Sequence, residues 1–283
     1  MNRPTDPTTS NEKKKLTDQI LSLTRALPLR APLVHVIPNG VSAAFCADVM
    51  AAAGARPVMA DYAGETEEIT AHSCAFVANM GQPSPEKEAA VRASLKAAAE
   101  HQIPAVLDPV GAGASAYRLR AISPLLQLPW NGILKGNASE IQTLQDAVLT
   151  HQGVDAEGIS PEKLSVRPPK QGRVLAVTGP CDRIVGHDRE VILSHIVPRS
   201  RPIVGTGCAA GCLCGCFAAL TEDLFSACAA ALSFWGFVQS QAEDSGGYGS
   251  CRIRLLDLLS DPDLDAFVLY LDSTLNLVKG VSD

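Results

Sequence analysis

The chain has 283 residues, 46% of them hydrophobic and 19% charged, a composition that predicts a buried core in one large α/β domain or two small ones. Its net charge is −6 at pH 7 and no basic stripe stands out, which disfavours nucleic-acid binding. Aromatic residues make up only 5%, too few for a platform that stacks single-stranded bases.

The first 15 residues are polar, contain two prolines and end in three lysines. They lack the apolar core of a signal peptide, so we expect residues 1–15 to be a disordered lead and residues 16–283 to form a single domain. A later apolar region, residues 208–238, is interrupted by Thr221, Glu222 and Asp223. It predicts two buried helices rather than a membrane span, and we expect no membrane partner.

Nine cysteines are present, and four of them lie between Cys208 and Cys216. A metal site is one interpretation of this group, but no histidine is near it and its spacing is not that of a paired zinc knuckle. Small, reduced core residues are the favoured interpretation. They indicate a reducing compartment, and we expect the cytoplasm.

Apolar segments and helical patterns alternate along the first two thirds of the chain. Helices are expected at residues 16–27, 41–53, 66–71, 84–101 and 139–149, and strands at 33–37, 57–60, 75–79, 105–108, 133–135 and 174–179. Thr66 is a candidate N-cap for its short helix. His35 lies within an apolar strand, where a buried histidine with satisfied hydrogen bonds is favoured over a catalytic one.

Residues 152–172 contain three prolines and should be loop-like. A hairpin is expected around His187 and Asp188, and a glycine turn at Gly205 then leads into two helices that reach Gln241. Residues 252–259 and 262–277 are expected to finish the chain as helices. The alternation of apolar strands with helices predicts an α/β fold with a mainly parallel central sheet and helices on both faces.

Polar residues follow the expected strands at their carboxyl ends, where ligands bind in open α/β sheets. They are Asn39, Asn79, Asp108, the group from Asn137 to Glu140, Thr178 and the turn at Gly205. Because parallel strands bring their carboxyl ends to one edge of the sheet, these residues predict a polar pocket at that edge.

Two carboxylates in this set have more than one interpretation. Asp108 opens the segment DPVGAG, where it can hold a divalent cation or polarise a hydroxyl, or can form an N-cap or a turn. Glu140 is three residues after Asn137, so both face the same way on one helical turn. Glu140 can hold Mg²⁺ through water, or can support the first turn of its helix.

The turn Gly205–Cys208 can hold an anion, because glycines let backbone N–H groups approach a ligand and the following helix N-terminus is positive. The alternative is a small-residue helix after an ordinary glycine turn. Thr178 can bond a phosphate or can be an ordinary strand-end threonine. A cation pocket beside an anion-binding helix start fits phosphoryl transfer, although the chain has neither a P-loop motif nor a dinucleotide-binding glycine motif after its first strand.

These motifs resemble the hydroxyethylthiazole kinases, a family of the ribokinase-like superfamily. The resemblance covers roughly residues 32–259, and its most specific part is the pair Asp108–Ala114 and Gly136–Glu140. Further matches, in family order, are Pro32–His35, Gly54–Ala60, Ala176–Gly179, Gly205–Cys208 and Gly247–Ser250.

The resemblance implies Mg²⁺-dependent phosphorylation by ATP of the primary alcohol of 4-methyl-5-(2-hydroxyethyl)thiazole, in a homotrimer with active sites between subunits. Implied roles are thiazole binding by Met59, Gly205 and Asn39; ATP binding by Lys135, Thr178 and Asn137; Mg²⁺ and phosphate at Asp108 and Glu140; and catalysis by Cys208, Asp108, Gly205 and Gly207. Cys208 stands where related sugar kinases place a base aspartate. At a helix N-terminus its thiol should have a lowered pKa and accept the alcohol proton.

The chain also departs from the family pattern. Lys135 replaces the usual arginine and so loses a planar two-pronged donor. The segment around Asn39 is altered, and residues 152–172 are proline-broken where the family has a helix. Two alternatives therefore stay open: a related kinase for another small alcohol, such as a hydroxymethylpyrimidine, or a non-catalytic member of the family.

Overall fold

The computed structural model describes residues 7–149, 160–167, 169–170, 172–194, 203–242 and 246–278. Its strands are β1 (Leu33–Ile37), β2 (Arg56–Met59), β3 (Ala75–Asn79), β4 (Ala105–Asp108), β5 (Gly132–Asn137), β6 (Arg173–Thr178), β7 (Asp182–Val185), β8 (Glu190–Leu193) and β9 (Leu275–Val278). Its α-helices are α1 (Pro7–Arg30), α2 (Ala43–Ala52), α3 (Thr66–Ala71), α4 (Pro85–Glu100), α5 (Ala116–Ile122), α6 (Ala138–Asp146), α7 (Thr206–Ala218), α8 (Leu224–Gln241), α9 (Tyr248–Ser260) and α10 (Leu264–Thr274).

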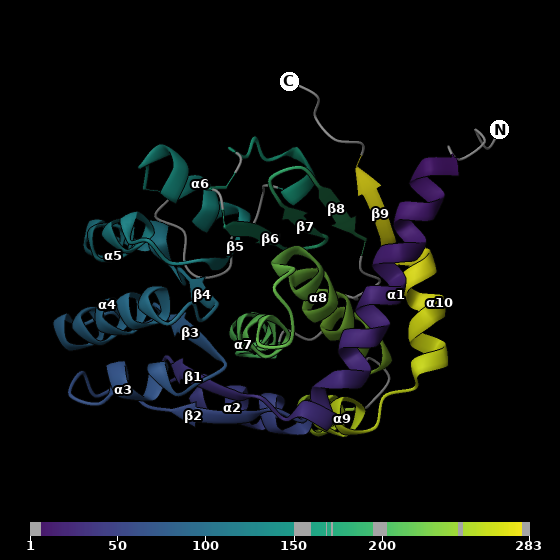
Figure 1. The fold of residues 1–283 in the computed structure, drawn as a ribbon, viewed down its shortest axis with the longest axis horizontal. Coiled ribbons are helices and arrows are strands. Elements are labelled where there is room, and N and C mark those ends of the chain that lie inside the picture. Colours follow the sequence, from purple (N-terminus) through teal and green to yellow (C-terminus); the bar gives the residue numbers. More distant parts are fainter. Residues whose placement is uncertain are drawn as a thin grey trace.

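The described strands form one sheet in the order β2-β1-β3-β4-β5-β6-β7-β8-β9 (Figure 1). Neighbours from β2 to β6 are parallel and those from β6 to β9 are antiparallel, which confirms the mainly parallel sheet and the expected hairpin. The last helix is shorter than expected. Residues 275–278 leave it and pair with β8 instead, because an edge strand at that position had backbone groups to satisfy.

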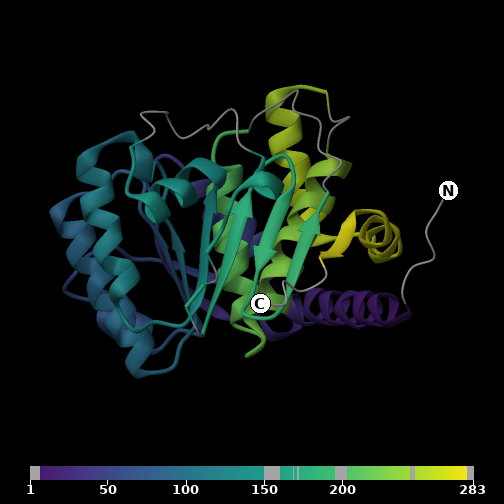
Figure 2. The same cartoon turned by 90° about the horizontal axis from the view of Figure 1, so that it is seen from above.

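Alternate residues of the central strands face two different cores. Val34 and Val36 of β1 join a core shared with α1, α2, α7 and α8, whereas Ile37 joins a second core shared with α4 and α5. Figure 2 shows the sheet between these two helical layers. The nearly continuous apolar runs of the strands follow from this burial on both faces.

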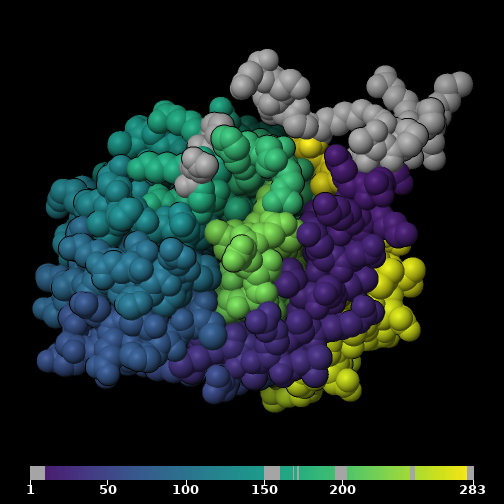
Figure 3. All heavy atoms as spheres, in the orientation of Figure 1, coloured from purple at the N-terminus to yellow at the C-terminus, as the bar shows by residue number. Residues whose placement is uncertain are grey.

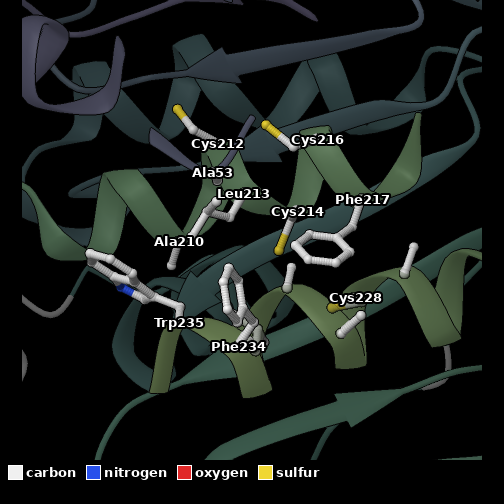
Figure 4. Packing of buried hydrophobic residues seen from close by; sticks show 14 of the residues in the cluster. Ala53, Ala210, Cys212, Leu213, Cys214, Cys216, Phe217, Cys228, Phe234 and Trp235 are labelled. Carbon is white, nitrogen blue, oxygen red and sulfur yellow. The ribbon is translucent and has the colours of Figure 1, made fainter. Parts of the chain in front are cut away.

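Small side chains allow α7 to lie close to the sheet and to α8. Gly215 faces Val77 so closely that an added Cβ would lie 2.3 Å from Val77 Cγ2. Figure 4 shows Cys212 and Cys216 on one side of α7, with Cys214 directed toward α8. All three thiols are buried and free, which confirms for them the interpretation as reduced core residues, whereas Cys208, the fourth of the group, is only partly buried.

The N-terminal segment differs from the expectation. Residues 7–15 belong to α1 rather than to a disordered lead, and residues 1–6 lie outside the described residues. Most side chains of residues 10–15 are exposed to solvent, while Leu16 and Ile20 bury the apolar face farther along the same helix. The helix extends over good helix formers such as Glu12 and Lys13, and Lys13 Nζ donates to the carbonyl of Asp272 in α10 at 2.8 Å. Figure 3 shows this purple segment beside the yellow C-terminal helices.

His35 is a buried core histidine, as expected. Its Nε2 lies 2.9 Å from the carbonyl of Ala60 and its Nδ1 lies 2.7 Å from Thr70 Oγ1.

Thr66 is not the N-cap of α3, because Glu65 occupies that position without a side-chain cap and Thr66 is fully buried. The Thr66 side chain is therefore buried in the contact between α3 and α4 and does not cap the helix, although threonine is a preferred N-cap residue.

Two further expectations concern the loop-like segment and the possibility of a membrane span, and both can be compared only with the described residues. Residues 152–159, 168 and 171 of the loop-like segment 152–172 lie outside them, and its described part includes a short 3-10 turn at Pro161–Lys163. Among the described helices, none combines the length and the apolar character that a membrane crossing requires.

We expect Gly215→Ala to lower the free energy of unfolding by about 1–3 kcal/mol, because the methyl group overpacks the contact between α7 and Val77. Urea unfolding of both proteins measures the change. Gly249→Ala is the matched control, since a Cβ on that helical glycine meets nothing within 4 Å and should leave stability unchanged or raise it slightly. Equal stability of the two variants would contradict the close approach of α7 to β3.

Candidate active site

The polar residues predicted to share one edge of the sheet do lie there. Asn79 is the register partner of Asp108, and Asn137 is the partner of Thr178. Parallel pairing therefore brings the ends of β3 and β4 together, and likewise the ends of β5 and β6. The N-terminus of α7 reaches the same edge, because Gly207 and Gly211 lie within contact distance of the Lys135 and Asp108 side chains.

The glycine turn has the conformation that requires glycine. Gly205 has φ +95°, a left-handed value that a side chain disfavours, and an added Cβ would lie 3.0 Å from Ser42 Cβ. The helix begins at Thr206, so the amides of Gly207 and Cys208 lie in its first turn, where no partner exists within the helix. The positive end of the helix dipole makes the position in front of these two amides favourable for an anion.

Asp108 and Lys135 form a buried ion pair at the floor of this site. Lys135 Nζ lies 3.3 Å from Asp108 Oδ2 and donates to the carbonyl of Gly207 at 2.9 Å. The two side chains are only 5% and 1% exposed. The lysine thus connects β4, β5 and the first turn of α7. The other carboxylate oxygen, Asp108 Oδ1, is buried and accepts no hydrogen bond from any described residue.

Burial and charge act in opposite directions on this pair. Burial raises the pKa of the Asp108 carboxyl, and the Lys135 ammonium opposes that rise. Burial by itself would lower the pKa of Lys135, but the charges of Asp108 and Glu140 outweigh it, so the net shift of the lysine is upward. The ammonium therefore stays charged at neutral pH.

Glu140 closes a capping box at the start of α6. Asn137 Oδ1 accepts from the Glu140 amide at 2.9 Å, and Glu140 Oε2 accepts from the Asn137 amide at 2.8 Å. The second oxygen, Oε1, accepts from the amide of Gly111 at 2.7 Å, where a left-handed φ of +69° requires glycine. Burial and the nearby Asp108 charge raise the pKa of Glu140 to about 7. Glu140 therefore supports its helix and also faces the site.

Asn39 connects the first strand end to Cys208. Its Nδ2 donates to Asn79 Oδ1 at 3.1 Å and to Cys208 Sγ at 3.3 Å. Its Oδ1 accepts from the amides of Val41 and Ser42. All the hydrogen-bonding groups of the amide are engaged, so the direction of the two N–H bonds is fixed.

The thiol of Cys208 does not have the lowered pKa expected from its place at a helix N-terminus. Burial and the nearby Asp108 carboxylate raise its pKa above the ordinary value. Desolvation and like-charge repulsion outweigh the helix dipole, because both disfavour a thiolate. Cys208 is therefore a neutral thiol at neutral pH.

Two implied ligand residues, Thr178 and Met59, lie near the site but outside these networks, whereas Lys135 is part of them. Thr178 Oγ1 lies 3.4 Å from the carbonyl of Gly136 at the end of the sheet. Met59 ends the edge strand β2, half-buried against the core that includes α7. Lys135 is buried beneath the turn rather than extended toward open solvent.

Sequence reasoning missed Lys87, which reaches the loops after β1 and β3 from α4. Its position gave one signal: a lysine in the first turn of a helix that starts directly after a strand end. The ion pair of Lys135 with Asp108 was missed as well, because residues in different strands become neighbours only through sheet pairing.

The donor groups fit a hard cation. Asp108 Oδ1 is a buried carboxylate oxygen to which none of the described residues donates a hydrogen bond, and the two Glu140 oxygens each keep a lone pair after accepting one amide. No cluster of three or more histidine, cysteine, aspartate or glutamate side chains suited to a metal occurs in the described residues. Mg²⁺ does not need one, since it keeps waters and binds one or two carboxylates together with substrate phosphates.

Comparison with known proteins supplies relatives over most of the chain. The sequence model of the hydroxyethylthiazole kinase family matches residues 25–263. A hydroxyethylthiazole kinase from Syntrophus aciditrophicus is 36% identical over 83% of this chain and 89% of its own length. One from Clostridium botulinum is 33% identical over 87% of this chain and 92% of its own length.

Solved structures agree with the fold. The hydroxyethylthiazole kinase protein from Pyrococcus horikoshii OT3 superposes with a TM-score of 0.75 at 26% identity, covering 94% of this chain and all of that one. A ribokinase-like superfamily protein from Enterococcus faecalis V583 shares the fold with a TM-score of 0.61 at 11% identity, over 90% of this chain and 94% of its own. The sheet with helices on both faces is thus ribokinase-like, as expected.

Removing the ammonium with Lys135→Met should cost about 3–5 kcal/mol of unfolding free energy at pH 8, because it leaves the Asp108 carboxylate buried and unpaired. Burial then raises the Asp108 pKa unopposed. A carboxyl with a raised folded-state pKa loses its stabilising effect as the pH rises through that value, so the variant should be closer to wild type at pH 5.5 than at pH 8. Urea unfolding at both pH values measures this.

The double variant Lys135→Met with Asp108→Asn is the control for that experiment. It removes the buried charge, so most of the pH dependence introduced by the single variant should disappear. An equal loss of stability at both pH values in the single variant would show that packing of the lysine stem, rather than the charge of Asp108, sets the cost.

Proposed function

The chain belongs to the hydroxyethylthiazole kinase family, and from this premise we propose that it transfers a phosphoryl group from ATP to the primary alcohol of 4-methyl-5-(2-hydroxyethyl)thiazole in thiamine biosynthesis or salvage. The observation that carries the proposal is the buried, unpartnered Asp108 oxygen beside the helix start at Gly205. Such an arrangement would set a cation ligand beside an anion position, as phosphoryl transfer requires.

The amides of the turn do most of the chemical work in this proposal. Those of Gly207 and Cys208 stabilise the charge that develops on the transferring phosphoryl group, together with the positive end of α7. Lys135 adds a fixed positive charge beneath the turn through its bond to the Gly207 carbonyl. Such groups do not reorganise during the reaction, so their stabilisation is available throughout.

Asp108 and Glu140 would hold Mg²⁺ and the phosphates of ATP. The bound cation would supply positive charge that offsets the charge of the phosphates. Asp108 offers its free Oδ1, and Glu140 offers the second lone pairs of its oxygens. Thr178 and Asn137, at the paired ends of β6 and β5, would contact ATP on the same side of the site.

The alcohol would bind on the side of Asn39, Cys208 and Met59, with Gly205 against the thiazole. The neutral Cys208 thiol accepts a hydrogen bond from Asn39, so it shapes the position of the hydroxyl rather than removing its proton. Phosphoryl transfer through a loose transition state has little need for a strong base. Positioning and charge stabilisation therefore supply most of the rate.

We also propose a homotrimer with sites between subunits, acting in the cytoplasm. Five large exposed apolar side chains lie in the loops after β1 and β2, directly before the glycine turn, or in α9, and an interface would cover them. They are Val41, Tyr62, Val204, Tyr248 and Ile253. All nine cysteines are free, which supports a reducing compartment.

Incubation with ATP, Mg²⁺ and the thiazole alcohol should give the phosphorylated thiazole, detected by mass spectrometry. A parallel incubation with hydroxymethylpyrimidine tests the alternative substrate suggested by the altered segment around Asn39. A higher kcat/KM for the pyrimidine than for the thiazole would identify the pyrimidine as the preferred substrate. Failure to phosphorylate either alcohol, with Mg²⁺–ATP present in excess, would contradict the proposal.

Two substitutions separate the roles of Asp108 and Cys208. Asp108→Asn should lower kcat by about 10²-fold or more, because it removes the charge that faces the cation and the phosphates. Cys208→Ala should retain at least roughly a tenth of kcat, since a thiol with a raised pKa is not the proton acceptor. Steady-state kinetics of both variants test this; a larger loss for Cys208→Ala than for Asp108→Asn would reverse the assignment.

A further inference from the structure

Lys87 contacts three backbone carbonyl groups, one in the loop after β1, one at the last residue of β3 and one in the loop after β3. It lies in the first turn of α4, and its Nζ is 2.6 Å from the carbonyl oxygen of Pro38 and 2.7 Å from that of Gly81. The carbonyl oxygen of Asn79 lies 3.4 Å from the same nitrogen. An ammonium has three N–H donors and no acceptor, so these three oxygens use all of them.

The surroundings of Lys87 destabilise a charged side chain in two ways. No ion pair to Lys87 occurs among the described residues, and its side chain is half-buried, which lowers its pKa. The first turn of a helix also disfavours a cation, because it is the positive end of the helix dipole. The converging carbonyl dipoles and the nearby charge of Asp61 therefore stabilise the ammonium, and the ammonium in turn holds the carbonyls together.

A second contact joins the same two loops. Gln82 Oε1 accepts a hydrogen bond from the amide of Gly40 at 2.9 Å. Gln82 has φ +54°, a left-handed conformation that a residue other than glycine keeps only when its surroundings impose it. The loop after β1 and the loop after β3 are thus held in one arrangement from both sides.

These loops carry the asparagines of the candidate site. Asn39 follows Pro38, and its amide bonds both Asn79 and Cys208. Asn79 Oδ1 also accepts from the amide of Gly81 at 2.9 Å, and an added Cβ on Gly81 would lie 2.9 Å from Asn39 Nδ2. A shift of either loop by a fraction of an ångström would therefore turn the Asn39 amide away from Cys208.

We propose that Lys87 is a positioning residue of the kinase site, whose ammonium serves as a built-in cation that gathers the carbonyls of Pro38, Asn79 and Gly81 and so directs Asn39 toward Cys208 and the substrate alcohol. The proposal rests on the proposed kinase function. It concerns the alcohol side of the site, because neither of the two loops contacts Thr178 or Glu140 through any hydrogen bond described above.

The test uses Lys87→Ala, which removes the ammonium and leaves space beside the three carbonyl oxygens. The KM for the thiazole alcohol should rise by about 10- to 100-fold, the effect of a misplaced binding group, while the KM for ATP stays within about twofold. Added ammonium or ethylammonium chloride should restore a large part of the lost alcohol affinity. A role in packing alone would not respond to a small cation with N–H donors.

Matched controls make the result specific. Lys96→Ala removes an exposed lysine from the same helix and should leave both KM values unchanged, with or without added amine. Tetramethylammonium chloride supplies the same ionic strength without an N–H donor, and should not rescue Lys87→Ala. Wild-type enzyme assayed in each salt corrects for direct effects on turnover.

The outcomes are distinct. Lack of turnover by the wild-type protein refutes the proposed function, whereas an active wild type combined with an unchanged alcohol KM in Lys87→Ala refutes the role of Lys87. An increased KM that ammonium and ethylammonium leave unaltered also overturns it, in favour of packing. If Lys87→Ala does not fold by circular dichroism, Lys87→Met keeps the stem and removes only the ammonium, and a wild-type alcohol KM in that variant overturns the proposal.

Discussion

The buried ion pair between Asp108 and Lys135 is the interaction on which the site depends. It joins β4 to β5, and the second bond of Lys135, to the carbonyl of Gly207, fixes the first turn of α7 against both strands. An ion pair that is buried away from water does not by itself favour folding, since the cost of desolvation offsets the attraction between the charges. It does fix which oxygen of Asp108 is engaged and leaves the other without a hydrogen-bond donor among the described residues.

Close packing makes this arrangement possible. Gly211 lies beside the Asp108 carboxylate and Gly215 lies against Val77, so α7 sits nearer to the sheet than a helix with larger side chains would allow. The amides at the start of α7 thereby come within reach of the strand ends. The site combines a fixed dipole from one element with carboxylates from two others, and backbone loops held by Lys87 complete its alcohol side.

Much of the fold was predictable because its signals are local. The apolar strand β3 and the turn after β1 followed from their own residues, and the polar strand ends indicated the edge that carries the site. Three of the expectations that were wrong depended on a distant partner. Thr66 lost its capping role to burial, residues 275–278 became a strand because β8 needed a neighbour, and the Cys208 thiol met the charge of Asp108.

The sequence by itself determined the family, the parallel core of the sheet and the set of polar residues at its carboxyl edge, because motif spacing and side-chain periodicity are properties of neighbouring residues. Only the tertiary structure decided which of those residues bond one another. It paired Lys135 with Asp108, bound Glu140 to Gly111, and brought Lys87 to the carbonyls of two loops. Charges, burial and hydrogen bonds act through space, so the protonation state of Cys208 follows from the fold and not from its place in the chain.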